Sequence, residues 1–199
     1  ELGRRMLPVL AETTGQLSNV TLIHGDALEF DWDQVEPGAA LVANLPYNVG
    51  TRLVTDALNA GRVSRIVVMV QREVAERMRA VPGDPAYGAL SVFVRHFASS
   101  RIVRDVPPGC FLPPPEVTSS VVRLDVHPDA VPDPELFRVV RQSFAHRRKT
   151  LRRNLMMAGY SGPTVLRALD VLQLNDLIRA EQLSLDQFRL LCTALADAG

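Results

Sequence analysis

The feature that most limits how this chain can fold is a pair of apolar runs without polar alternation, "AALVAN" (39–44) and "RIVVMV" (65–70). Runs of this kind are typical of strands that are buried on both faces of a parallel sheet. Helical patterns follow them over 48–59 and 71–80. The alternation predicts an α/β fold with a mostly parallel sheet that helices cover on both faces.

Further elements extend this pattern in both directions. Helices are predicted over 3–15 and 86–97. The segment "NVTLIHGDAL" (19–28) predicts a strand that ends near His24. Two later strands, "SSRIVRDV" (99–106) and "SSVVRLDV" (119–126), are joined by a proline-rich segment. We expect these two to join the sheet as an antiparallel addition.

The chain changes character after His127. "HPDAVPDP" reads as a proline-punctuated linker, and helical patterns fill the rest. Ser184 and Gln187 have capping-box spacing at the start of the last helix. We therefore predict an α/β domain over 1–127 and a small all-helical domain over 128–199. The helices of the second domain are predicted over 134–146, 149–158, 163–171 and 184–197.

Composition limits the functional classes. Of the 199 residues 47% are hydrophobic, and no run approaches the ~18 apolar residues of a membrane span. Cys110 and Cys192 are far apart and lack metal-ligand spacing, so we expect neither a disulfide scaffold nor a metal site. The features predict a cytoplasmic protein without a membrane partner. Because no exposed apolar stripe stands out, we expect a monomer.

The formal net charge is zero, but the basic residues are unevenly spread. Seven arginines and lysines, and no acidic residue, lie between residues 138 and 153. A concentrated basic segment in a neutral protein indicates a polyanionic partner; the alternative is a solvated helix face. The seven residues are Arg138, Arg141, Arg147, Arg148, Lys149, Arg152 and Arg153.

Polar residues stand at the predicted carboxyl ends of strands, where ligands of open α/β sheets collect. Asp26 follows one strand, Asn44 ends another, and Glu1 stands where the residue after a preceding strand would stand. Acidic residues in such places commonly bind a ribose or an adenine amino group. Together they indicate a nucleoside site, although an Asp in this position is also common as a turn or N-cap residue.

Asn44-Leu45-Pro46-Tyr47 adds a requirement of its own. An amide oxygen and nearby backbone carbonyls can accept both hydrogens of an exocyclic amino group, which keeps the nitrogen lone pair directed at an electrophile. Pro46 fixes the backbone, and Tyr47 offers a stacking surface worth about 1–3 kcal/mol per base. The alternative is a simple strand-to-helix turn.

The motif "NLPYN" resembles the fourth motif of amino-group adenine methyltransferases that use S-adenosylmethionine. Three further segments, "MVQREVAERMRAVPGDPAYGALSV", "CFLPPPEVTSSVVRL" and "SFAHRRKTLRRNL", are similar to the KsgA family of small-subunit ribosomal RNA adenine dimethyltransferases. The resemblance implies a Rossmann-like class I methyltransferase sheet with a small all-helical C-terminal domain. Erythromycin-resistance methyltransferases of large-subunit (23S) RNA share the Asn-Leu-Pro-Tyr motif and stay an alternative.

The resemblance implies roles on the target side of the site. Asn44 would orient the adenine N6 and lie against the cofactor, with the Leu45 carbonyl as second acceptor and Pro46 holding the turn. Tyr47 and Phe111 would stack on the two faces of the flipped base. Since N6 of a paired adenine is inaccessible, the base must be extruded from its helix.

The resemblance also implies the ligands. Glu1 would bind the ribose hydroxyls of S-adenosylmethionine, and Asp26 with Ala27 its adenine. The methyl acceptors would be two adjacent adenines in a hairpin near the 3′ end of 16S ribosomal RNA, within the immature 30S subunit, and DNA would not be a partner. The implied RNA-binding residues are Arg141, Arg147, Arg148, Lys149, Arg152 and Arg153.

One departure concerns the cofactor. Family members carry a strand and a glycine-rich loop before the acidic residue matched by Glu1, where this sequence starts. From the usual size of a βα unit, roughly 50–70 residues are expected there. We therefore expect the 199-residue chain to bind S-adenosylmethionine poorly, and a non-catalytic RNA-binding or ribosome-assembly protein is an alternative.

Overall fold

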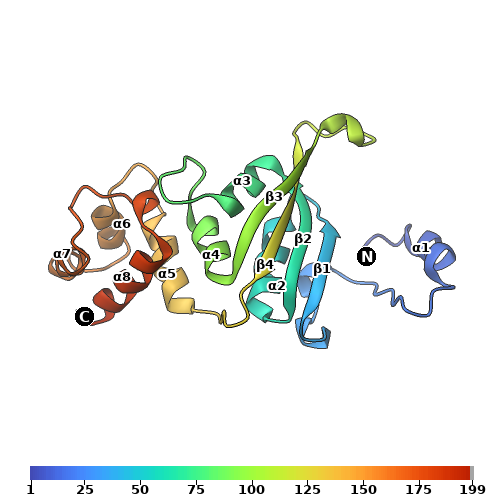
Figure 1. Ribbon diagram of the computed structural model, residues 1–199, viewed down its shortest axis with the longest axis horizontal. Coiled ribbons are helices and arrows are strands. Elements are labelled where there is room, and N and C mark those ends of the chain that lie inside the picture. The colour runs from blue at the N-terminus through green and yellow to red at the C-terminus, as the bar shows by residue number, and fades with distance from the viewer. Residues whose placement is uncertain (198–199) are drawn as a thin grey trace.

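The computed structural model describes residues 1–197. In this range four strands form one sheet in the order β1-β2-β4-β3 (Figure 1). The elements in chain order are α1 (Leu7–Thr14), β1 (Ala39–Asn44), α2 (Gly50–Ala60), β2 (Val63–Gln71), α3 (Arg72–Arg79), α4 (Ala89–Phe97), β3 (Ala98–Val106), β4 (Ser119–Val126), α5 (Pro134–Ser143), α6 (Leu151–Met157), α7 (Gly162–Val171) and α8 (Leu185–Asp197).

The sheet is mixed. β1 runs parallel to β2, and β4 runs antiparallel to both β2 and β3. The antiparallel addition is confirmed, but the expectation of a mostly parallel sheet is wrong for the described residues. The connections give the reason: α2 carries the chain back to start β2 parallel to β1, whereas residues 107–118 only turn the chain around between β3 and β4.

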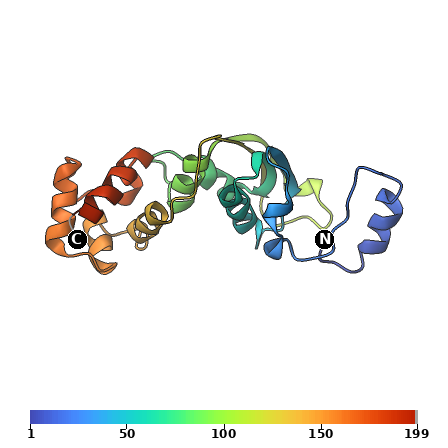
Figure 2. The same ribbon diagram turned by 90° about the horizontal axis from the view of Figure 1, so that it is seen from below.

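Helices pack on one face of this sheet. α2, α3 and α4 lie on the same side (Figure 2), where Ile66 and Val122 are fully buried. The opposite face is not covered by these helices, and we call it the open face. Val42 on this face is 75% exposed. The prediction of helices on both faces is therefore wrong for the described residues, because α1 packs on neither face and has no buried residue.

The segment before β1 departs most from prediction. The helix expected over 3–15 shortens to α1, and the strand expected within 19–28 does not form. A strand needs a neighbouring segment that forms hydrogen bonds along its length. For residues 19–28 the neighbour is Glu1 alone, which forms two backbone hydrogen bonds. The amino group of Glu1 donates to the Ile23 carbonyl (2.9 Å), and the Glu1 carbonyl accepts from the Gly25 N–H (3.1 Å).

The C-terminal helices agree better with the sequence. The helices predicted over 163–171 and 184–197 form as α7 and α8. The predicted capping box is confirmed: Ser184 Oγ accepts from the Gln187 N–H (3.2 Å), and Gln187 Oε1 accepts from the Ser184 N–H (2.9 Å). Residues 198–199 of the predicted helical domain lie outside the described residues.

Aromatic side chains join the helices after residue 127 to the rest of the chain. The rings of Phe93 and Phe97 on α4 lie 4.6 and 5.7 Å from the Phe137 ring on α5. The Tyr87 hydroxyl donates to the Leu183 carbonyl at 2.8 Å, and burial raises the pKa of Tyr87 to about 12. This hydroxyl therefore stays protonated, and able to donate, through neutral pH. The division at residue 127 stays a prediction.

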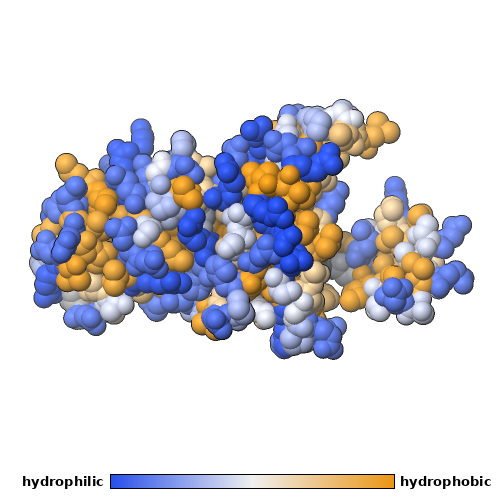
Figure 3. Space-filling model, in the orientation of Figure 1, coloured by the Kyte–Doolittle hydropathy of each residue, from blue (hydrophilic) through white to orange (hydrophobic). Residues whose placement is uncertain are grey.

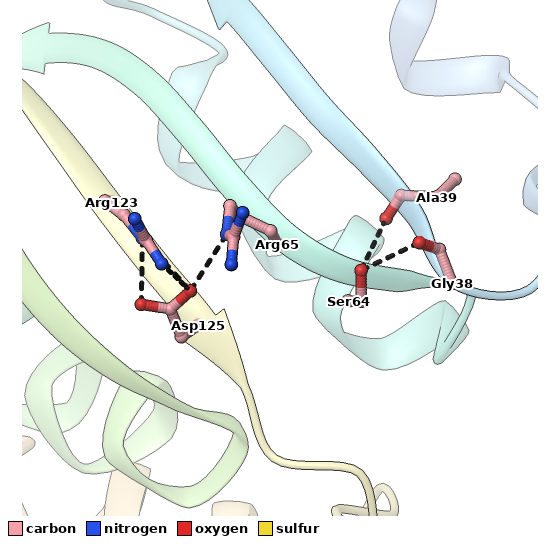
Figure 4. A network of polar contacts seen from close by, with 6 residues as sticks. All are labelled: Gly38, Ala39, Ser64, Arg65, Arg123 and Asp125. Carbon is pink, nitrogen blue, oxygen red and sulfur yellow. Dashed lines mark hydrogen bonds and ion pairs between the residues drawn. The ribbon is translucent and has the colours of Figure 1, made fainter.

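Arg65, Arg123 and Asp125 form an ion network on the sheet (Figure 4). Arg65 Nε lies 2.9 Å, and Arg123 Nη2 2.7 Å, from Asp125 Oδ1. Beside them, the Ser64 hydroxyl donates to the Gly38 carbonyl at 2.7 Å and ties the start of β1 to β2. Hydrogen bonds from Arg123 first, and then from Arg65, lower the pKa of Asp125 to about 2.

We expect Asp125 to make the free energy of unfolding depend on pH in the acid range. Its folded-state pKa lies below the ordinary value of 3.8, so its stabilising contribution is present above that pH and is lost as the pH falls towards 2. Asp125→Asn should remove this part of the dependence in urea denaturation series between pH 5 and pH 2. Asp129→Asn changes an exposed acid that has no ion pair within residues 1–197 and is the control. Equal pH profiles for wild type and Asp125→Asn would contradict the expectation.

Candidate active site and RNA-binding surface

The end of β1 presents Asn44 at the edge of the sheet. Asn44 pairs in register with Met69, and the next N–H, of Leu45, donates to the Met69 carbonyl at 3.3 Å. Pro46 then turns the chain, and its carbonyl accepts from the N–H groups of residues 49 and 50 at the start of α2 (3.2 and 2.9 Å). Gly50 suits this close approach, because a Cβ at this position would make a tight contact of 3.2 Å with the Leu45 Cβ.

The residues of the Asn44–Tyr47 motif differ in burial. Leu45 is buried in the core, whereas Asn44, Pro46 and Tyr47 are exposed. Within residues 1–197 no hydrogen bond reaches the Leu45 carbonyl or the Asn44 amide. Both acceptors that the sequence predicts for an amino group therefore keep their lone pairs available.

Tyr47 is fixed through its hydroxyl. Its Oη lies 2.7 Å from Oγ of Ser119, a fully buried residue at the start of β4. In the sheet Ser119 pairs with Gln71 and Val106, so the contact joins the motif to three strand ends. Tyr47 stays 38% exposed, which leaves ring surface for stacking.

Phe111 lies in the 107–118 connection, which projects beyond the sheet (Figure 1). Its N–H donates to the Pro108 carbonyl at 3.1 Å, and the end of the connection is tied down by the Arg72 N–H, which donates to the Thr118 carbonyl at 3.0 Å. Phe111 is half-buried, and among the described residues no ring contact joins it to Tyr47.

Glu1, Asp26 and Ala27 come together in one cavity of 350 Å³ before β1. Glu1 Oε1 accepts from the Gly3 N–H (2.7 Å), and Asp26 Oδ1 accepts from the Leu28 N–H (2.9 Å) as the N-cap of a short 3-10 turn. Asp26 therefore acts as an N-cap residue, which was the alternative to a ligand-binding role. Each of the two carboxylates still has a second oxygen that can accept from a ligand. Asn44 does not line this cavity.

These residues fit the adenosine part of S-adenosylmethionine. A ribose diol and an adenine amino group are donors, and the two fixed carboxylates offer acceptors to both. The Phe30 side chain lines the same cavity and supplies apolar surface for a planar base.

The predicted basic segment folds as two helices around a turn. The helix expected over 134–146 ends at Ser143, and residues 144–150, the basic turn, separate α5 from α6. Asn154, only 2% exposed, holds this turn: its Nδ2 donates to the carbonyls of Ser143 (2.7 Å) and His146 (3.2 Å), and its Oδ1 accepts from the His146 N–H (3.1 Å). The clamp ends the first helix early and exposes the arginines and lysine of the turn.

The basic residues differ in how they are paired. Arg138 lies 2.7 Å from Glu135, Arg152 lies 2.5 Å from Asp176, and Arg147 donates to the Pro85 carbonyl. Four of the predicted RNA-binding residues have neither a carboxylate partner nor a side-chain hydrogen bond within residues 1–197. They are Arg141, Arg148, Lys149 and Arg153.

A cleft of 330 Å³ lies between α3 and the helices after residue 127. Arg147 and Lys149 of the basic turn line it together with Arg77 of α3 and Arg179, and Glu181 is the one acidic residue of its lining. Glu181 lies 3.9 Å from Arg179. Sequence reasoning missed Arg77 and Arg179, because each stands next to acidic residues in the chain and neither belongs to a run of like charge.

Residues 1–197 contain neither a candidate membrane-spanning helix nor a candidate metal site. No helix in that range has the length and apolarity needed to cross a bilayer. The same residues contain no group of three or more side chains that could hold a metal ion.

Comparison with known proteins identifies similar sequences along the whole described chain. The family described as ribosomal RNA adenine dimethylase matches residues 1–197. The ribosomal RNA small subunit methyltransferase A of Deinococcus radiodurans is 44% identical over 196 residues, which cover 98% of this chain and 67% of that protein. The protein of the same name from Ligilactobacillus salivarius is 40% identical over 215 residues, with 100% of this chain and 73% of the relative covered.

Two solved structures share the fold. A dimethyladenosine transferase from Plasmodium falciparum superposes with a TM-score of 0.83 at 24% identity, covering 100% of this chain and 81% of that one. The 23S rRNA methyltransferase ErmE gives a TM-score of 0.70 at 21% identity, covering 98% and 80%. The predicted Rossmann-like methyltransferase sheet with a helical C-terminal region is thus confirmed.

Proposed function

The chain belongs to the ribosomal RNA adenine dimethylase family, and from this premise we propose that it transfers methyl groups from S-adenosylmethionine to N6 of two adjacent adenines. The adenines lie in a hairpin near the 3′ end of the 16S ribosomal RNA. The observation that carries the proposal is the pair of acceptors without a hydrogen bond in residues 1–197 at the end of β1, the Asn44 amide and the Leu45 carbonyl, beside an anchored Tyr47.

In the proposed mechanism the residues of the chain position the adenine. The Asn44 oxygen and the Leu45 carbonyl accept the two N6 hydrogens, and Pro46 keeps the two acceptors in place. Tyr47 and Phe111 stack on opposite faces of the extruded base. The lone pair of N6 is thereby directed away from these acceptors and towards the methyl donor, and positioning supplies most of the rate enhancement.

S-adenosylmethionine supplies an electrophilic methyl group carried on a sulfonium. Glu1 would hold its ribose hydroxyls, while Asp26 and the backbone of Ala27 would hold its adenine. After attack the amine carries a positive charge and gives its proton to water, so none of the described side chains has to act as a strong base.

The basic turn and the cleft beside it bind the phosphates of the RNA. Arg141, Arg148, Lys149 and Arg153 have no carboxylate partner among the described residues, so their charge is available to a polyanion. Arg147 and Arg152 contribute positive charge while contacting other parts of the chain. The protein acts in the cytoplasm, as a monomer, on the immature 30S subunit.

The test is a methylation assay on immature 30S subunits with labelled S-adenosylmethionine. The proposal expects label in N6,N6-dimethyladenosine of the 16S RNA, with S-adenosylmethionine supplied in excess because the chain is expected to bind it weakly. Tight binding to the subunit without any label would favour the non-catalytic assembly protein. Label on 23S RNA alone would favour the resistance-type activity, which the similarity of fold to ErmE keeps as the second candidate.

A further inference from the structure

Leu112 is the most exposed large hydrophobic side chain of residues 1–197. It is 99% exposed, although burial of a leucine stabilises a protein by about 1.5–3 kcal/mol. Its neighbours in the 107–118 connection limit how the backbone can move. Proline fixes one backbone dihedral at each of five positions there, namely Pro107, Pro108, Pro113, Pro114 and Pro115.

The 107–118 connection is anchored to the candidate active site at its base. Val106 and Ser119 pair across β3 and β4 where the connection begins and ends, and Ser119 Oγ contacts the Tyr47 hydroxyl at 2.7 Å. From this base the connection projects past the sheet, and its far end is hydrophobic (Figures 1 and 3). The tip is therefore held away from the sheet, while its base is joined to Tyr47 through Ser119.

Phe111 and Leu112 point to different sides of the connection. The backbone at Phe111 is extended (φ −122°, ψ 154°), and successive side chains of an extended chain alternate in direction. Phe111 is half-buried and Leu112 is fully exposed, as this alternation requires. If Phe111 covers the extruded adenine, Leu112 faces the RNA from which the adenine came.

A single exposed leucine needs no functional explanation in general. Leu177 and Val171, for example, are 79% and 71% exposed in the helical part of the chain, where no base-binding motif adjoins them. Leu112 differs because it combines full exposure, a proline-restricted backbone and an anchor on the residue that holds Tyr47.

We propose that Leu112 is a wedge that enters the base stack of the RNA where the adenine has left it. Extruding a base costs a few kcal/mol of stacking and pairing. Apolar side chains, leucine among them, can enter a base step and restore part of the lost contact. This inference rests on the proposed function, because a wedge has a role only if an adenine is extruded.

The experiment follows extrusion without requiring methyl transfer. A 16S hairpin RNA carries 2-aminopurine, which is fluorescent when unstacked, directly beside the target adenines, so that each target keeps its N6 amino group and the reporter loses its stacking neighbour when the adenine leaves. Wild-type protein should raise the fluorescence on binding. Leu112→Ala should lower the population of the extruded state by about tenfold, equivalent to ~1.4 kcal/mol of lost wedge contact, and Leu112→Phe should restore it.

A single-stranded RNA and a matched variant distinguish the wedge role of Leu112 from a general effect on RNA binding. A single-stranded RNA of the same sequence has no gap to fill, so Leu112→Ala should bind it as wild type does. Leu190→Ala removes another exposed leucine, on α8, and should leave extrusion unchanged. Since Leu112 is 99% exposed, the variants keep the fold.

The outcomes are distinguishable. Equal fluorescence with wild type and Leu112→Ala, or an equal loss of binding to hairpin and single strand, would overturn the wedge while leaving the proposed function in place. Wild-type protein that binds the hairpin without raising the fluorescence would overturn both the wedge and the extrusion mechanism. Failure of wild type to bind the RNA at all would reject the proposed function, and the wedge with it.

Discussion

Replacing Asn44 by alanine is expected to lower kcat/KM for methylation of the 30S subunit about 100-fold or more. The amide oxygen is one of two acceptors that orient N6, and a misplacement of about 1 Å in an oriented reaction can reduce the rate about 100-fold. The residue is exposed at the end of β1, and its amide has no hydrogen bond within residues 1–197, so the loss should not come from unfolding. Initial rates with labelled S-adenosylmethionine measure the effect.

Asn44→Asp is the matched variant for this prediction. It keeps an acceptor oxygen in the same place and should retain more activity than Asn44→Ala. The midpoint of thermal unfolding should be similar for all three proteins. If Asn44→Ala kept more than about half of the wild-type kcat/KM, the orienting role would be refuted, since transition-state contacts of this kind are worth far more than a factor of two.

Removing two cations of the basic turn, Arg148→Ala with Lys149→Ala, should weaken binding to 16S RNA about 10- to 50-fold near 0.1 M salt. Neither side chain has a carboxylate partner in the part of the chain that the structure describes. Each phosphate contact contributes ~0.7–0.9 to the slope of log affinity against log salt, so the slope should become shallower by about 1.4–1.8. Binding titrations at several salt concentrations measure both quantities.

The control changes the net charge equally at paired positions. Arg62 lies 3.0 Å from Asp33, and Arg189 lies 3.1 Å from Asp186, so Arg62→Ala with Arg189→Ala removes two cations that already have partners. This double variant should keep the wild-type salt slope. A slope that falls equally in both double variants would mean that overall charge, and not the basic turn, sets the affinity.

The place of the Asn44–Tyr47 motif in the fold was largely predictable because its residues are contiguous. Asn44, Leu45, Pro46 and Tyr47 follow a strand whose end the apolar pattern marks, and Pro46 leaves the backbone few alternatives. The sequence did not indicate the Tyr47 contact with Ser119, which joins residues 72 positions apart. The exposure of Leu112 was equally inaccessible, because solvent contact depends on how the whole connection leaves the sheet.

The basic surface shows where one-dimensional charge patterns fail. Counting cations along the chain found the basic turn, but it could not tell that Arg152 is paired with Asp176 while Lys149 is unpaired. Nor could it place Arg77 and Arg179 in the same cleft as the turn. These facts depend on distances between side chains that are remote in sequence.

By itself the sequence determined the positions of β1 to β4, the helices after residue 127 and the order of the motifs, since β-branched runs, caps and prolines act on their own neighbours. Only the tertiary structure decided that the sheet is mixed, that one face is open, and that no strand forms within 19–28. Strand direction and pairing require hydrogen-bond partners from distant parts of the chain, and the local sequence of a strand does not specify which partner it meets.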